Sequence, residues 1–105
     1  MTFGEVIAAE RKKRGLSQKD LALRVQREDG STISPQYLND IERNRRNPPS
    51  EELIEKFAGA LEIEAEYLFY LAGQMPPELR DGNRSRENVN DAFVAFRKAL
   101  NKGKP

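Results

Sequence analysis

Apolar residues recur along the chain with the spacing of amphipathic α-helices, and polar stretches separate one apolar segment from the next. In the first segment Phe3 and Ile7 share one helical face, and the later segments repeat this spacing. The predicted helices cover residues 2–14, 18–25, 35–43, 51–61, 64–73 and 89–100. The pattern therefore predicts an all-α protein with five consecutive helices and an additional C-terminal amphipathic helix.

Residues at the predicted helix ends support these boundaries. Ser17 is a good N-cap, and Asp20 three residues later completes a capping box. Ser34 caps the next helix, and Pro35 occupies its first position, where a missing N–H costs nothing. The remaining predicted N-caps are Thr2, Ser50 and Asn88. The helix that begins at Pro35 ends at Asn44, so residues 18–43 form two short helices joined by a turn.

The sequence does not decide two features of the predicted core. Glu10 lies where an apolar residue would be expected, so it either thins the core or turns outward and pairs. In the fifth helix Leu68 and Leu71 are expected to face inward. That helix carries too many aromatic residues for one buried stripe, so some fill the core and others are exposed: Tyr67, Phe69 and Tyr70.

The helix that starts at Ser34 has an outward face of amide and charged side chains: Gln36, Asn39, Asp40 and Arg43. Amide side chains can donate and accept in bidentate pairs with adenine, and arginine can read guanine or hold a phosphate. This chemistry is typical of a helix that reads DNA.

Three segments in order resemble the helix-turn-helix domain of the phage repressor and Cro-like family, also called the xenobiotic-response-element type. They are LSQKDLA, ISPQYLNDIERN and NPPSEELIEKFAGAL, and the resemblance covers residues 3–73. It implies a five-helix DNA-binding domain in a sequence-specific transcriptional regulator of repressor type. The helix that starts at Ser34 would lie in the major groove of double-stranded DNA.

The resemblance also suggests roles for individual residues. Gln36, Asn39 and Arg43 are the expected base contacts, whereas Pro35 stands where relatives often carry a base-contacting glutamine. The expected contacts to the DNA backbone are Gln18, Lys19, Arg45, Arg46 and Asn47. An arginine of the first helix, Arg11, is expected to pair with Glu42 and lock the recognition helix. The alternative for that pair is an ordinary surface ion pair worth ~0 to 1 kcal/mol.

The turn between the two short helices departs from the family, where a short glycine-containing turn is usual. Here the polar run 26–32, with Asp29-Gly30 inside it, separates the helices. It has no apolar anchor before Ile33, so we expect a mobile surface loop that hangs free or rests on the DNA backbone through Arg27.

Composition narrows the remaining functions. The chain has no Cys and no His, which removes thiol chemistry, imidazole catalysis and structural zinc, and we expect neither a metal site nor a cofactor. With no phosphate loop or catalytic cluster, an enzyme is not expected.

No apolar run approaches the ~20 residues of a membrane span, and a cytoplasmic location at the nucleoid is expected. Residues 1–49 and 80–105 are net basic and residues 50–79 net acidic, so a polyanion would meet the first and last segments.

Residues 1–79 are interpreted as the DNA-binding domain, and residues 80–105 as a polar connector with a C-terminal helix. The apolar face of that helix is expected to form a homodimer interface through Val89, Phe93, Phe96 and Leu100. The competing interpretation is that the helix folds back on its own domain. At the level of function, the alternative is a protein-interaction adaptor, or the antitoxin of a toxin–antitoxin pair, built on the same fold.

Overall fold

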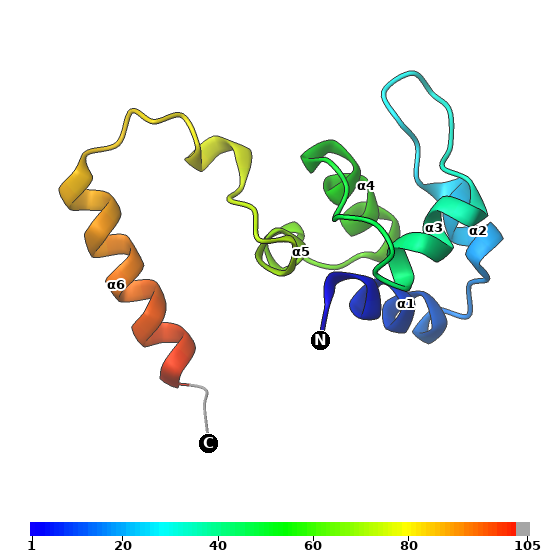
Figure 1. Ribbon diagram of the computed structural model, residues 1–105, viewed down its shortest axis with the longest axis horizontal. Coiled ribbons are helices and arrows are strands. Elements are labelled where there is room, and N and C mark those ends of the chain that lie inside the picture. Colours follow the sequence, from blue (N-terminus) through cyan, green and yellow to red (C-terminus); the bar gives the residue numbers. More distant parts are fainter. Residues whose placement is uncertain (103–105) are drawn as a thin grey trace.

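The computed structural model describes residues 1–102, and over that range it is all-α apart from one isolated β-bridge. The helices are α1 (Phe3–Lys13), α2 (Gln18–Arg24), α3 (Pro35–Glu42), α4 (Glu51–Leu61), α5 (Ala65–Ala72), a 3₁₀ turn η1 (Pro77–Leu79) and α6 (Arg86–Lys102). The predicted fold class is confirmed. In Figure 1, α1 to α5 lie together, whereas α6 lies beyond α5 at the edge of the molecule and is joined to it by a segment that contains η1.

Side-chain caps begin the first four helices where the sequence predicts them. Thr2 and Ser17 each form a reciprocal capping box, with Glu5 and Asp20 respectively. Ser34 accepts a hydrogen bond from the Tyr37 backbone N–H at 3.0 Å, and Pro35 is the first residue of α3. Ser50 accepts one from the Leu53 N–H at the start of α4. These local interactions satisfy backbone donors that a helix leaves free at its N-terminus.

The apolar faces of α1 to α5 bury one core, in which α3 packs against both α1 and α2, and α4 against α5. Glu10 does not thin this core, because it turns outward and pairs with Arg14 at 2.6 Å. In α5 the buried pair is Leu68 and Phe69, and Leu71 is only half-buried, so the prediction that Leu71 faces inward is only partly right. The largest fully buried side chains are Phe57, Ile7, Leu21, Leu38, Ile54, Leu61, Leu68 and Val25.

The run 26–32 is a short hairpin and not an unanchored loop. An antiparallel bridge joins Gln26 to Thr32, and the Arg27 N–H donates to the Ser31 carbonyl at 2.7 Å. Buried Val25 and Ile33 fix its two ends, since the Ile33 N–H donates to the Val25 carbonyl at 3.2 Å. The expectation of a loop that hangs free is therefore wrong for the base of this segment (Figure 1, cyan).

The C-terminal helix α6 begins earlier than predicted. Its first turn is capped by Ser85, whose hydroxyl accepts from the Asn88 N–H at 3.0 Å, so Asn88 is inside the helix and is not its cap. No residue of α6 is buried. The helix therefore does not fold back as a buried sixth member of the core. In the described range, none of the helices combines the length and the apolar character that a membrane crossing needs.

Candidate nucleic-acid interface

Helix α3 presents a polar face to solvent and an apolar face to the core. Leu38 and Ile41 are buried, whereas Gln36 and Arg43 are exposed on the other side. The Gln36 amide Nε2 donates to Asp40 Oδ1 at 3.1 Å, and Arg43 Nε donates to Asn39 Oδ1 at 3.2 Å. The three predicted base-contacting residues thus lie on one outward surface, and within-helix hydrogen bonds hold their side chains in place.

A buried ion pair connects α1 to the end of α3. Arg11 Nε donates to Glu42 Oε2 at 2.7 Å, and Arg11 Nη2 donates to Glu42 Oε1 at 2.9 Å, which is a bidentate geometry. Both residues are 9% exposed, so this is not an ordinary surface pair. A third donor, Arg11 Nη1, bonds the Leu16 carbonyl at 2.9 Å. The hydrogen bonds with Glu42 raise the pKa of the Arg11 guanidinium above its ordinary value. The pair thus ties α1, the turn before α2, and the end of α3 together.

Gln18 has a bridging position that the sequence did not indicate. Its amide Nε2 donates to Glu42 Oε1 at 3.0 Å and to Asn39 Oδ1 at 3.2 Å, so it connects α2 to both the buried pair and the outward face. The Asn39 oxygen therefore accepts hydrogen bonds from both Gln18 and Arg43. Contact of Gln18 with a DNA phosphate stays a prediction.

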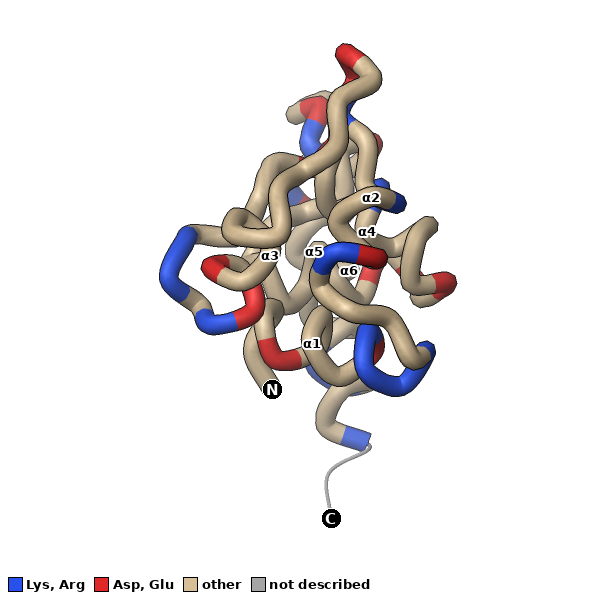
Figure 2. Tube along the Cα trace, turned by 90° about the vertical axis from the view of Figure 1, so that its right-hand side faces the viewer, with Lys and Arg blue, Asp and Glu red and all other residues tan. Residues whose placement is uncertain are grey.

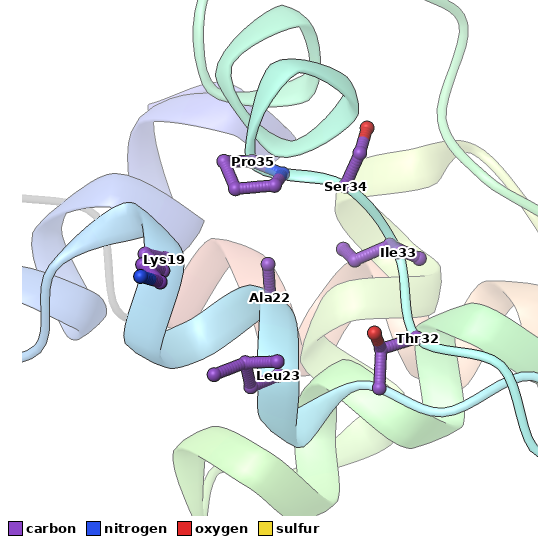
Figure 3. Close-up of a pocket in the computed structure, with 7 residues that line it drawn as sticks. All are labelled: Lys19, Ala22, Leu23, Thr32, Ile33, Ser34 and Pro35. Atoms are coloured by element: carbon purple, nitrogen blue, oxygen red, sulfur yellow. The ribbon is translucent and has the colours of Figure 1, made fainter.

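Helix α2 and the segment that leads into α3 border a hollow of about 350 Å³. In Figure 3, Lys19 and Leu23 extend from α2, and Pro35 lies opposite with Ala22 between them. Thr32, Ile33 and Ser34 complete the lining. Lys19 is the one charged group in this lining, beside the point where α3 begins. Pro35 offers only an apolar ring here, so it can contact a thymine methyl group but cannot donate a hydrogen bond.

The segment after α3 is exposed and basic. Asn44 adopts a left-handed conformation with φ of 58°, which turns the chain away from the helix axis. Arg45, Arg46 and Asn47 follow and are exposed. The side view in Figure 2 shows a blue loop beside α3 and a second blue segment near the end of α1. The predicted backbone-contacting residues after α3 therefore adjoin the outward face of the helix.

Tyr37 is a member of this surface that the sequence analysis missed. The guanidinium carbon of Arg46 lies 5.0 Å from the centroid of the Tyr37 ring, and that of Arg27 lies 5.4 Å from it. Arg46 also approaches Asp40 at 3.5 Å. The available signal was the place of Tyr37 immediately before buried Leu38, at the border between the apolar and polar faces of α3.

The residues predicted for a dimer interface lie on α6, away from α3. Val89, Phe93, Phe96 and Leu100 are all exposed. The Phe96 ring meets Tyr70 of α5 edge-on, with centroids 6.5 Å apart. Between α5, η1 and α6 there is an apolar groove of about 610 Å³, whose lining includes Met75, Leu79 and Phe93.

In residues 1–102, the carboxylate side chains do not form any group of three or more that could hold a metal ion, and the chain has neither His nor Cys.

Comparisons with known proteins place this arrangement in a family. A family model described as helix-turn-helix matches residues 7–68. The chain is 45% identical over 64 residues to an immunity repressor protein of Bacillus phage phi105, and the match spans 61% of this chain but 40% of that repressor. In fold it is similar to a chain of the SinR protein/SinI protein complex, with a TM-score of 0.56, 23% identity and coverage of 96% of this chain and 99% of that one. Proteins of this repressor family are generally not enzymes. The chain belongs to the helix-turn-helix family of the Cro and C1 type and carries its DNA-binding domain.

Proposed function

We propose that the protein is a sequence-specific transcriptional regulator of repressor type, which reads the major groove of double-stranded DNA with α3. The observation that carries the proposal is the buried Arg11–Glu42 pair behind an exposed polar helix face. A helix that reads bases must be held in one orientation, because a small rotation would move its side chains off the base edges. The 45% identity to a phage immunity repressor supports the same function.

In this proposal the residues divide into two groups. Gln36, Asn39 and Arg43 read base edges, because amides pair with adenine and arginine with guanine. Lys19, with Gln18, meets one phosphate backbone at the start of α2. On the other side of α3, the exposed segment with Arg45, Arg46 and Asn47 meets the second backbone. Residues 1–79 would form the unit that binds DNA.

The test begins with selection of bound sequences from a random duplex pool, which should enrich one motif. Binding of variants to that motif and to an unrelated duplex is then measured over a range of salt concentrations. Gln36→Ala should weaken specific binding by ~1 to 3 kcal/mol and leave nonspecific binding nearly unchanged. Arg46→Ala should weaken both and lower the slope of log affinity against log salt by about 0.9. Lys56→Ala removes the same charge from the exposed side of α4 and serves as the control.

An unenriched pool together with affinity that does not depend on salt would rule out this function. Equal losses of specific and nonspecific affinity in both variants would refute the division of labour while leaving DNA binding in place.

We further propose that the protein binds DNA as a homodimer joined through α6. A single recognition helix reads only a few base pairs, so two copies on adjacent half-sites about one helical turn apart gain specificity. The exposed side chains of α6 supply the apolar surface, and burial of Phe93 and Phe96 would contribute roughly 1.5 to 3 kcal/mol each. The groove between α5 and α6 continues this surface and would be covered by the second copy.

Sedimentation of the full chain beside a chain that ends at Arg80 tests the dimer. The full chain should be a dimer at micromolar concentration, and the shortened chain a monomer. A full-length monomer, or a shortened chain that dimerises equally well, would refute the role of α6. A palindromic motif from the selected pool would support two-fold symmetry independently.

The exposed apolar face of α6 also favours a second function, as the docking surface for another protein in an adaptor or antitoxin. A measurement of DNA affinity over a range of salt concentrations distinguishes these functions. A pure adaptor would bind its partner without salt-dependent affinity for DNA, whereas an antitoxin would bind both DNA and its partner.

A further inference from the structure

The hairpin between α2 and α3 places an arginine beside the recognition helix. Arg27 belongs to the hairpin, and its guanidinium lies over the ring of Tyr37 on α3. Arg46, from the segment after α3, lies over the same ring. We call Arg27, Tyr37 and Arg46 the arginine–tyrosine cluster. All three residues come from different elements, so only the tertiary structure brings them together.

The cluster lies on a defined side of α3. Asn39 faces α2, because its Oδ1 accepts a hydrogen bond from Gln18. Tyr37 is two residues earlier in the same helix, and residues two apart do not share a face. The cluster therefore flanks the outward face of α3 on the side opposite the start of α2. Gln36 and Arg43 lie between these two flanks.

This placement matches the shape of the major groove. The groove is about 12 Å wide and is bordered by two phosphate backbones. A helix that lies in it has one backbone on each side. The start of α2 can meet one of them through Lys19. The cluster is positioned to meet the other, and it carries two guanidinium groups.

A cation–π contact with an aromatic ring prepares an arginine for phosphate binding. The guanidinium carbons of Arg46 and Arg27 lie 5.0 and 5.4 Å from the centroid of the Tyr37 ring, and each guanidinium carries several N–H donors. Those N–H groups form bidentate hydrogen bonds with phosphate oxygens. Because contact with the ring restricts the arginine side chain before DNA binds, binding should cost less side-chain entropy.

The carboxylate of Asp29 in the hairpin is bound within its own turn. The Asp29 carboxylate accepts hydrogen bonds from the Ser31 N–H at 2.9 Å and the Ser31 hydroxyl at 2.6 Å, so it closes its own turn. These bonds also lower the pKa of Asp29. At the neighbouring position, the Glu28 N–H donates to Glu52 Oε1 at 2.8 Å, which ties the hairpin tip to the start of α4. Glu28 is thus joined to α4, and Arg27 lies beside α3.

From these contacts we propose that the arginine–tyrosine cluster is a phosphate clamp, in which the hairpin adds Arg27 as a backbone contact that a short turn between α2 and α3 would lack. The inference rests on the proposed DNA-binding function and extends it, because it assigns a DNA contact to the inserted hairpin. The clamp adds affinity and fixes the register of α3, but it reads no bases.

The test compares Arg27→Ala with the unaltered protein and with Lys56→Ala, on the selected motif and on an unrelated duplex. Arg27 is exposed, so its replacement should leave the thermal unfolding midpoint nearly unchanged. Arg27→Ala should lower the log–log salt slope by about 0.9 for each protomer bound, and weaken specific and nonspecific binding alike. Tyr37→Phe keeps the ring and should keep the slope, whereas Tyr37→Leu should reproduce part of the Arg27→Ala effect. Hydroxyl-radical footprinting should show loss of protection at the backbone positions on one side of each half-site only.

An Arg27→Ala protein that retains the full salt slope and the full footprint, while the unaltered protein binds its motif, would overturn the clamp and leave the proposed function intact. Absence of DNA binding by the unaltered protein would overturn both. A change in sequence preference on Arg27→Ala, with no change in slope, would show a base contact and would also contradict the clamp.

Discussion

Replacement of Glu42, the buried partner of Arg11, tests how much their ion pair contributes to the free energy of unfolding. In Glu42→Ala the guanidinium of Arg11 would remain at a site that is 9% exposed, without its carboxylate. Glu42 accepts three hydrogen bonds, two from Arg11 at 2.7 and 2.9 Å and one from Gln18 at 3.0 Å. Removal of one partner of a buried ion pair costs about 3 to 5 kcal/mol. We expect about 3 kcal/mol, because the site lies near the surface and water can reach the guanidinium after the change.

The measurement is urea unfolding followed by far-ultraviolet circular dichroism. With a slope of about 1 to 1.5 kcal/mol per molar urea for a domain of this size, the midpoint should fall by about 2 to 3 M. Glu10→Ala is the matched control, since Glu10 pairs with Arg14 in the same region with one quarter of each side chain exposed. That pair should contribute less than about 1 kcal/mol. The double change Arg11→Met with Glu42→Leu should recover most of the loss, because no unpaired charge remains.

A loss below about 1 kcal/mol for Glu42→Ala, equal to that of the control, would refute the reasoning, because the pair would then behave as a surface ion pair. The locking role has a separate measurement. The double variant should fold stably yet bind the selected motif more weakly, since an apolar contact does not fix the rotation of α3 as a bidentate pair does. Unchanged specific affinity in a stably folded double variant would contradict that role.

Three further changes have expected outcomes that thermal or acid unfolding can check. Gly4→Ala should destabilise the protein by roughly 1 to 3 kcal/mol, although alanine has the better helix propensity, because the new Cβ would lie 2.2 Å from the Ile41 carbonyl oxygen. An increase in stability would refute this close approach. Glu62→Gly should stabilise by about 1 kcal/mol, because Glu62 ends α4 in a left-handed conformation with φ of 56°; a lower midpoint would contradict it. Hydrogen bonds with Ser17, from its backbone N–H and its side chain, lower the pKa of the Asp20 carboxyl below its ordinary value. The contribution of Asp20 to stability is therefore present above the ordinary pKa and is lost as the pH falls through the lowered pKa. Asp20→Asn should therefore flatten the acid side of the stability profile, and an unchanged profile would show that the capping box does not titrate with folding.

Local sequence determined where most of the helices begin and which faces they bury. A capping serine or threonine interacts with residues two or three positions away, so Thr2, Ser17, Ser34 and Ser50 could be identified without any tertiary contact. The apolar period then indicated the core positions of α1 to α4. The predicted cap at Asn88 was wrong, because Ser85 offers an equally good cap three residues earlier and no local pattern distinguishes the two. The outward face of α3 followed from the same periodicity.

Tertiary structure decided the contacts that join distant segments. Gln18 turned toward Glu42 because α2 and α3 pack against each other there. The hairpin could be anchored to α4 only once Glu52 lay beside the Glu28 N–H. Tyr37 joined two arginines from segments before and after its own helix. Each of these contacts depends on the relative placement of whole helices, which is set by packing of the shared core, and no pattern within one helix contains that information.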